Sequence, residues 1–149
     1  RRPGWQSAML PVLLDTFAAE LAEDYARTLN RFLALQVRGS ENSAAVLKML
    51  RALMLLQGEP NADALRAGLE LLRTTDLRDR FGKIECPVLL LAGERDTLVP
   101  VSAMRAAGEL FHAAQLQVID GAGHAPFIAQ PGQVAKQVTE FLRADLAQG

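Results

Sequence analysis

The chain has 149 residues, of which 50% are hydrophobic and 22% are charged, with a formal net charge of −1. This length is enough for one domain with a buried core, and with one Trp, one Tyr and six Phe that core must be mainly aliphatic. The near-neutral charge argues against a nucleic-acid-binding protein. The single cysteine excludes an internal disulfide framework, and no apolar run reaches the roughly 20 residues of a membrane span.

The lone cysteine and the first residues give expectations about cellular context. Cys86 precedes the apolar run Val88–Leu91, which predicts a buried, inert side chain where a strand begins. One free cysteine fits a reducing compartment, and we expect a cytoplasmic protein. Residues Arg1–Trp5 are not followed by the apolar region of a signal peptide. The sequence has no initiator Met, so we expect it to start within a longer protein.

Residues 9–73 are predicted to be helical almost throughout. Apolar residues at steps of three and four predict one long amphipathic helix, and they are Leu14, Phe17, Leu21, Tyr25, Leu29 and Phe32. A second helix is predicted over residues 43–57, with Leu47, Leu50 and Met54 on one face. Residues 58–60, Gly-Glu-Pro, end it, and Asn61 is predicted to cap a third helix carrying Leu65, Leu69 and Leu72.

After about residue 80 the pattern changes to alternating strands and helices. The apolar run 87–92, closed by Gly93, predicts a strand buried on both faces of a parallel sheet. A helix over 101–112 and a second strand over 115–119 follow. A last helix is predicted over 133–146, with Val134, Val138, Phe141 and Leu142 on one side. This order is typical of an α/β fold, and two strands are too few for its sheet.

Each predicted strand is followed by a loop with a titratable side chain, Asp96 after the first and His124 after the second. Carboxyl ends of parallel strands meet at one sheet edge, where catalytic groups gather in α/β proteins. A carboxylate there can fix the tautomer of an imidazole and stabilise its protonated form. We therefore expect an acid–base pair in which His124 takes a proton from a nucleophile.

Simpler interpretations of these residues stay open at this point. Asp96 could bond its own backbone in a turn, and His124 could be a solvated loop residue. Asp120 is a rival acid, although it lies only four residues from His124 across a glycine turn. His112 is expected at the surface, at a helix end.

Two segments carry a resemblance to a known family. Residues 87–100, PVLLLAGERDTLVP, and 121–127, GAGHAPF, resemble the acid and histidine motifs of α/β-hydrolases. In the helical half, residues 27–36, RTLNRFLALQ, together with 68–73 and 75–78, resemble the lid of the pimeloyl-[acyl-carrier protein] methyl ester esterases of biotin synthesis. The resemblance covers essentially the whole chain.

The resemblance implies an α/β-hydrolase fold fragment. Residues 1–80 correspond to a helical lid that is incomplete at its N-terminus, and 81–149 to the last two strand–helix units of the core. Asp96 and His124 correspond to the acid and base of a Ser-His-Asp triad that hydrolyses a methyl ester. The chain's serines, Ser7, Ser40, Ser43 and Ser102, do not lie in Gly-x-Ser-x-Gly, so the nucleophile is expected outside this chain, which alone is expected to be inactive. Neither a metal nor an organic cofactor is implied.

The predicted lid also suggests a partner. Residues 27–51 carry five basic residues and one acid, Glu41, whereas Asp15, Glu20, Glu23 and Asp24 precede them without nearby bases. The resemblance implies that Arg27 and Arg31 dock an acidic acyl-carrier protein, with Lys48 nearby and Phe32 facing either the acyl chain or the core. Where two further family arginines align, this chain has Ala44 and Lys48. Alternatively, these charges only complement helix dipoles.

Two other classes of function remain compatible with the sequence. One is a different α/β-hydrolase, such as a general short-chain carboxylesterase or a peptidase. The other is a non-catalytic helical binding module that has kept a hydrolase-like tail. Neither a nucleic-acid nor a membrane partner is expected, and the oligomeric state is not predicted.

Overall fold

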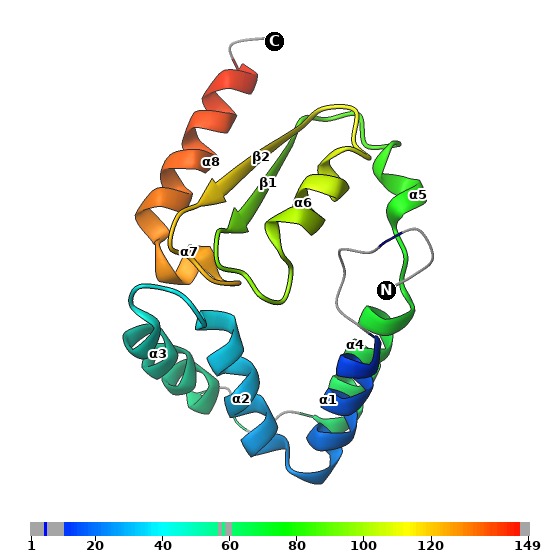
Figure 1. The fold of residues 1–149 in the computed structure, drawn as a ribbon, viewed down its shortest axis with the longest axis vertical. Helices are drawn as coiled ribbons and strands as arrows, with labels where there is room; N and C mark the ends of the chain where they lie inside the picture. The colour runs from blue at the N-terminus through cyan, green and yellow to red at the C-terminus, as the bar shows by residue number, and fades with distance from the viewer. Residues whose placement is uncertain (1–4, 6–10, 57, 59–60, 147–149) are drawn as a thin grey trace.

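A computed structural model of the chain describes residues 5, 11–56, 58 and 61–146. Four helices form what we call the helical half, namely α1 (Pro11–Glu23), α2 (Tyr25–Val37), α3 (Ser43–Leu56) and α4 (Ala62–Thr74). The sheet half follows, with α5 (Arg78–Phe81), β1 (Val88–Gly93), α6 (Val101–Gly108), β2 (Ala114–Ile119), α7 (Pro126–Ala129) and α8 (Pro131–Leu146). Figure 1 shows the helical half as a V beneath the carboxyl ends of the strands.

The expected single helix over residues 14–32 is wrong, because the chain turns at Asp24. The Asp24 side chain accepts a hydrogen bond from the backbone N–H of Arg27 at 3.0 Å and so caps α2. The rings of Phe17 and Phe32 pack with centroids 5.3 Å apart. One continuous helix would separate these residues by roughly 22 Å. The apolar stripe therefore belongs to two helices, α1 and α2, that contact each other through these rings.

The third and fourth helices agree closely with the sequence expectation. Helix α3 begins at Ser43 and ends at Leu56, while Gln57 lies outside the described residues. Asn61 caps α4 as predicted, its side chain accepting from the backbone N–H groups of Asp63 and Ala64. Leu72 lies on α4 as expected, and 70% of its surface is exposed.

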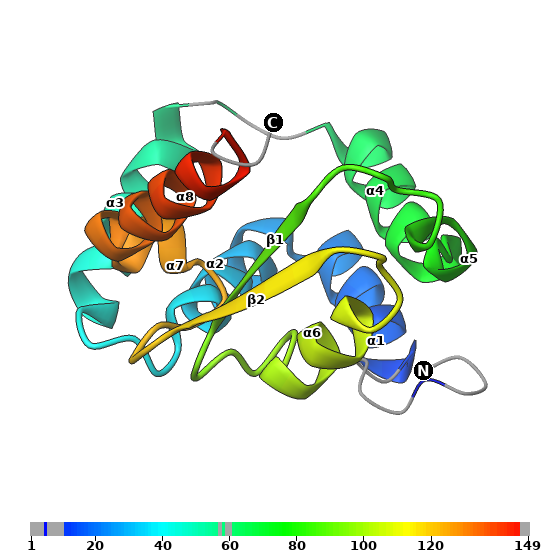
Figure 2. The same cartoon turned by 90° about the horizontal axis from the view of Figure 1, so that it is seen from above.

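Within the described residues, β1 and β2 form one parallel two-stranded sheet, in which Gly93 is paired with Ile119. The crossover helix α6 lies on one side of the sheet and α8 on the other (Figure 2). The strand predicted over 87–92 was expected to be buried on both faces, but β1 is only half-buried from Val88 to Leu91 and is buried at Ala92 and Gly93. Parallel sheets are usually covered on both faces, and the half-buried residues of β1 fit a sheet of more than two strands.

Two local expectations in the sheet half are wrong. Cys86 is exposed rather than buried, because it lies in the connection after α5, two residues before β1 begins. Helix α6 ends at Gly108, not at 112, and the chain then turns so that Phe111 stacks on Phe81 with centroids 4.6 Å apart. His112 follows this turn and is exposed, as expected.

The short helix α7 contacts elements of both halves. It begins at Pro126, whose fixed φ suits the first helical position, and it contacts both α3 and β1. Figure 1 shows it between the sheet and the α2–α3 pair, directly after the loop that carries His124. Among the described helices, none has the length and apolar character needed to cross a membrane.

Candidate active site

The ends of β1 and β2 bring Asp96 and His124 together. Gly93 and Ile119 are opposite each other in the sheet, and the two loops leave it side by side. The Nδ1 atom of His124 lies 2.8 Å from Oδ2 of Asp96. The Asp96 side chain is only 6% exposed, whereas the imidazole is 34% exposed. The acid is thus enclosed, while the ring is partly open to a reacting group.

The second carboxylate oxygen of Asp96 is held by its own loop. Oδ1 accepts hydrogen bonds from the backbone N–H groups of Leu98 at 2.8 Å and Val99 at 2.9 Å. This is the turn-forming role that was considered as a simpler alternative. The structure combines both roles, because the turn bonds orient the carboxylate whose other oxygen meets His124.

Electrostatics of the pair favour an ionised acid beside a basic imidazole. Burial raises the pKa of Asp96, but hydrogen bonds from His124 and from the backbone of Val99 and Leu98 outweigh it and leave the pKa below its ordinary value. The hydrogen bond with Asp96 raises the pKa of His124 despite partial burial. An ionised carboxylate only accepts hydrogen bonds. Nδ1 is therefore the protonated nitrogen of the neutral ring, and Nε2 is the free acceptor.

The rival acid Asp120 does not take this place. It is exposed, at the beginning of the histidine loop, and its backbone carbonyl accepts a hydrogen bond from Nε2 of Gln130 at 2.6 Å. The imidazole pairs with Asp96 instead. Geometry thus separates two acids that the sequence left as alternatives.

Gly93 permits the close approach of the two loops. A Cβ atom at this position would lie 2.0 Å from the carbonyl oxygen of Gly123 and 2.6 Å from that of Ala122. The neighbouring Glu94 then reaches across, accepting a hydrogen bond from the N–H of Gly121 at 2.8 Å. From the sequence, Gly93 was interpreted as the end of the strand and as part of the acid motif, not as the point where the two loops approach each other. A glycine directly before the acid loop is the sequence signal that could have indicated this close approach.

The α2–α3 turn, residues 38–42, packs behind the same two loops. Ser40 is 6% exposed, and its Oγ accepts a hydrogen bond from the N–H of Gly123 at 2.9 Å. Arg95 donates from Nη1 to the carbonyl of Gly39 at 2.9 Å. These contacts join residues 83 and 56 positions apart. From the sequence, Ser40 was known only as a serine outside the nucleophile motif.

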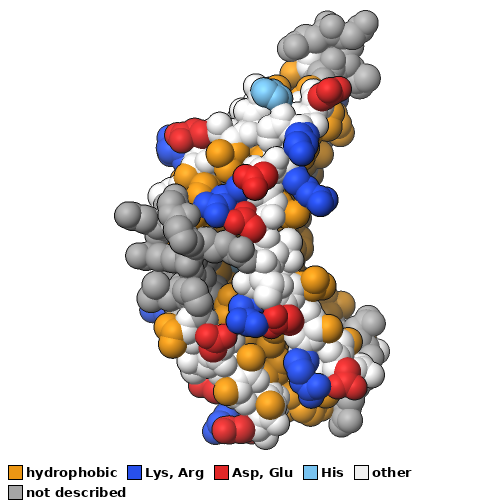
Figure 3. All heavy atoms as spheres, turned by 90° about the vertical axis from the view of Figure 1, so that its right-hand side faces the viewer, with side chains coloured by type: hydrophobic (Ala, Val, Ile, Leu, Met, Phe, Trp, Pro, Cys, Tyr) orange, Lys and Arg blue, Asp and Glu red, His pale blue; other side chains and the backbone are white. Residues whose placement is uncertain are grey.

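The charges of the helical half are more closely paired than expected. The acids before residue 27 are not without bases, because Arg31 forms an ion pair with Glu20 at 2.8 Å and Arg27 approaches Asp24 at 3.8 Å. Folding α1 back onto α2 creates the first pair. Both arginine side chains still have more than 60% of their surface exposed, at 66% for Arg27 and 63% for Arg31. Figure 3 shows one face of the molecule, on which basic and acidic side chains are interspersed with hydrophobic ones.

The other two predicted binding residues differ in environment. Phe32 is half-buried and packs against Phe17, which is the core role that the sequence left as an alternative. Lys48 is exposed on α3. Within the described residues, neither Phe32 nor Lys48 has a hydrogen bond, ion pair or ring contact with Asp96 or His124.

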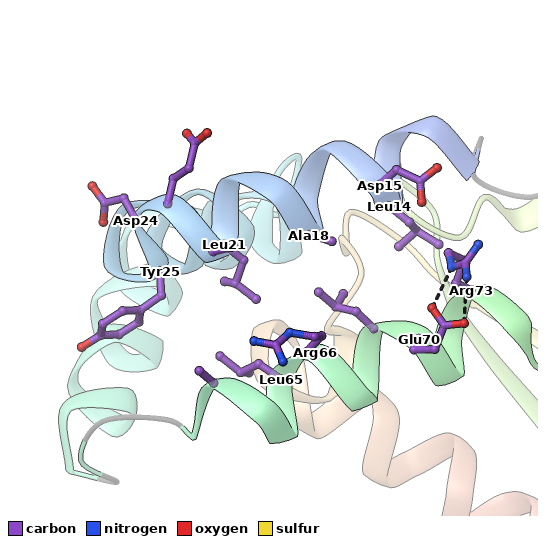
Figure 4. Close-up of a pocket in the computed structure, with 14 residues that line it drawn as sticks. Leu14, Asp15, Ala18, Leu21, Asp24, Tyr25, Leu65, Arg66, Glu70 and Arg73 are labelled. Carbon is purple, nitrogen blue, oxygen red and sulfur yellow. Dashed lines mark hydrogen bonds and ion pairs between the residues drawn. The ribbon is translucent and has the colours of Figure 1, made fainter.

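The described residues of the helical half form at least two grooves. One of about 560 Å³ runs between α1 and α4 (Figure 4), where Leu14, Leu21 and Leu65 point inward and Arg73 pairs with Glu70 at the rim. The other, of about 660 Å³, lies between α2 and α3, and its lining includes Arg31, Arg38, Leu35, Ala44 and Leu47. Neither is lined by Asp96 or His124. The candidate site therefore rests on the geometry of the acid–histidine pair.

The described residues contain no cluster of three or more His, Cys, Asp or Glu side chains that could hold a metal ion. What the pair can do is exchange a proton at Nε2 while Asp96 stabilises the positive ring. Such a pair suits activation of a hydroxyl nucleophile.

Known proteins of similar sequence show which family the chain resembles. A pimeloyl-[acyl-carrier protein] methyl ester esterase of Xanthomonas campestris is 42% identical over 144 residues, which cover 97% of this chain and 57% of that protein. One from Stenotrophomonas maltophilia is 41% identical over 97% of this chain and 56% of its own length. The chain thus spans little more than half the length of these relatives.

Solved structures show the same fold. An esterase from Exiguobacterium antarcticum superposes with a TM-score of 0.84 at 19% identity, covering 96% of this chain and 52% of that one. A thermophilic esterase from Thermogutta terrifontis gives a TM-score of 0.73 at 23% identity, covering 90% and 50%. The family profile described as alpha/beta hydrolase fold matches residues 4–131. The chain therefore belongs to the α/β-hydrolase fold family.

Proposed function

We propose that this chain is the lid and C-terminal core of a serine ester hydrolase, and that its substrate is the methyl ester of pimeloyl-[acyl-carrier protein]. The observation that carries the hydrolase assignment is the 2.8 Å contact between His124 Nδ1 and Asp96 Oδ2 at the strand ends. The substrate assignment is supported by relatives that carry this name at 42% identity. In this proposal α1–α4 are the lid and the sheet half is the core.

The proposed reaction uses a serine that lies outside this chain. Its hydroxyl attacks the ester carbonyl while Nε2 of His124 accepts the hydroxyl proton. Asp96 remains ionised and stabilises the imidazolium. The proton then passes from Nε2 to the departing methoxy oxygen, which leaves as methanol. Water repeats the sequence on the acyl-enzyme, so that the free acid is released and the serine is restored.

The surface of the proposed lid has features that suit a charged macromolecular substrate. Arg27 and Arg31 lie one turn apart on α2 with most of their surface exposed, and Lys48 is exposed on α3. Arg31 also lines the groove between α2 and α3, whose other wall includes the apolar Leu47. A cationic rim beside an apolar groove suits an acidic carrier with a phosphate-bearing acyl arm.

The test compares substrates on the complete enzyme, meaning the polypeptide that contains this chain together with its nucleophile. Methanol release is measured from pimeloyl-carrier methyl ester and from a short free methyl ester, and amine release is measured from a peptide amide. We expect the highest kcat/KM on the carrier-linked ester, and His124→Ala should remove several orders of magnitude of kcat. A preference for short free esters or for amides would support the rival hydrolases. Absence of turnover would support the binding module.

The 149-residue chain alone should not hydrolyse p-nitrophenyl esters, because its serines lie outside a nucleophile motif. Turnover by the purified chain that disappears on mutation of one of its own serines would contradict the proposed arrangement.

A further inference from the structure

Ser40, a buried residue of the α2–α3 turn, is hydrogen-bonded to Gly123, the residue directly before the candidate base His124. Ser40 Oγ accepts the hydrogen bond from the N–H of Gly123 at 2.9 Å, and both residues are buried. Gly123 is also closely surrounded, since a Cβ there would lie 2.8 Å from the carbonyl oxygen of Arg38 and 3.0 Å from that of Gln36. The histidine loop therefore packs against the C-terminal end of α2 and is hydrogen-bonded there to the Ser40 hydroxyl.

We propose that Ser40 is a positioning residue for the reaction, acting through the Gly123 amide to hold the His124 ring against Asp96. This rests on the proposed function in taking His124 as the base. Ser40 makes no bond to the imidazole itself. Its influence passes through one peptide unit, because the amide that it holds immediately precedes the histidine.

A second contact shows that the same turn meets the acid loop. Arg95, directly before Asp96, donates to the carbonyl of Gly39 at 2.9 Å. The Arg95 side chain is 51% exposed, so water can replace this bond. The bond from Gly123 is buried, and water cannot readily replace it. Of these two hydrogen bonds, the one between Ser40 and Gly123 is therefore the one whose loss would disturb the histidine loop.

Removal of the hydroxyl leaves the Gly123 N–H buried without an acceptor. The loop then shifts to find a new partner and carries His124 with it. The 2.8 Å contact with Asp96 fixes the ring tautomer, and small displacements of catalytic groups are costly in rate. Because Ser40 does not contact the substrate in this account, the loss should fall on kcat rather than on KM.

The test uses the complete enzyme and three variants, Ser40→Ala, Ser40→Thr and Ser102→Ala. Ser102 is an exposed serine at the beginning of α6 and serves as the matched control. We expect Ser40→Ala to lower kcat by up to about 100-fold with KM unchanged. Ser40→Thr keeps the hydroxyl and should retain most of kcat, and Ser102→Ala should match wild type.

Proton and nitrogen NMR of the His124 ring gives a readout that does not depend on turnover. Its signals are assigned by comparison with a His124→Gln variant. We expect Ser40→Ala to shift the Nδ1 proton resonance and to lower the His124 pKa, while Ser40→Thr leaves both near wild type. If Ser40→Ala does not fold, Ser40→Cys replaces it, since a thiol is a weaker acceptor of similar shape, and an intermediate loss of kcat is expected.

Wild-type kcat and wild-type ring signals in Ser40→Ala, or in the Cys variant where Ala does not fold, would overturn the positioning role, even with a lower melting temperature. The bond would then stabilise the fold without orienting the base. If the wild-type enzyme hydrolyses no ester, the proposed function fails, and the ring signals alone decide the role of Ser40.

Discussion

Nδ1 of His124 and Oδ2 of Asp96 lie 2.8 Å apart although the two residues are 28 positions apart in the chain. The distance follows from one strand–helix–strand step, because β1 and β2 are parallel and their ends are in register at Gly93 and Ile119. The acid is buried and held by backbone N–H groups, and the imidazole is partly open. This arrangement allows specific expectations for pH dependence, packing and substrate choice.

The pH–rate profile should report the raised pKa of His124. The base must be neutral to accept a proton, so kcat/KM should rise with pH through a midpoint above the ordinary value of 6.5. The largest cause of the shift is the hydrogen bond with Asp96. The residual activity of Asp96→Asn should therefore have its midpoint at lower pH. Identical midpoints in both enzymes would contradict this assignment.

The same pair should make the stability of the complete enzyme depend on pH. The raised pKa of His124 stabilises the fold below its unfolded value of about 6.5 and ceases to do so as pH rises through the folded pKa. The lowered pKa of Asp96 stabilises the fold above about 3.8 and ceases to do so as pH falls through the folded pKa. His124→Gln should therefore lose more unfolding free energy at pH 6 than at pH 9, measured by urea denaturation. An equal loss at both would refute the coupling.

Gly93→Ala should severely destabilise the fold, because the new Cβ would lie 2.0 Å from the Gly123 carbonyl oxygen. The backbone must shift at the end of β1, and overpacking costs typically 1–3 kcal/mol or more. Gly68→Ala in α4 is the control, since a Cβ there meets no atom within 4 Å. That change should be neutral or stabilising by roughly 0.5–1 kcal/mol. Equal stability of the two variants in urea would show that the two loops are less closely packed.

The lid prediction separates carrier docking from helix stabilisation. Reversing Arg27 and Arg31 to Glu should raise KM for the carrier-linked ester and leave turnover of a small free ester nearly unchanged. Added salt should reduce the difference, because screening shortens the reach of exposed charges to about 8 Å at physiological ionic strength.

The matched control reverses Arg66 and Arg73, which also form ion pairs, with Asp63 and Glu70 on α4. This control should leave the KM of both substrates unchanged. Loss of an exposed ion pair is worth at most about 1 kcal/mol and would affect both substrates alike. Equal effects of the two double reversals on the carrier-linked ester would count against docking by α2.

Local patterns predicted much of the fold and the acid–base pair. The cap at Asn61 and both strands follow from residues close in sequence, and strand order brought Asp96 and His124 to one edge. The break at Asp24 was missed because the apolar period continues across it. Only packing of Phe17 on Phe32 shows that two helices share that stripe.

The contacts between the α2–α3 turn and the two loops could not be predicted from the sequence, for a physical reason. Ser40 and Gly123 are 83 residues apart, and each is a small residue with several common roles. No periodicity connects them, and only the folded chain shows that one amide meets one hydroxyl. The ion pair of Arg31 with Glu20 likewise depends on the turn at Asp24.

The central claim, that Asp96 and His124 form the acid–base pair of an ester hydrolase, is tested most directly by kcat of Asp96→Asn beside Asp120→Asn in the complete enzyme. Asp96→Asn should lose roughly 10⁴-fold, as in serine proteases where the same change spoils the histidine tautomer. Asp120→Asn should keep near-normal activity, because its exposed side chain is not the partner of the imidazole. Near-normal kcat for Asp96→Asn with a large loss for Asp120→Asn would contradict the account.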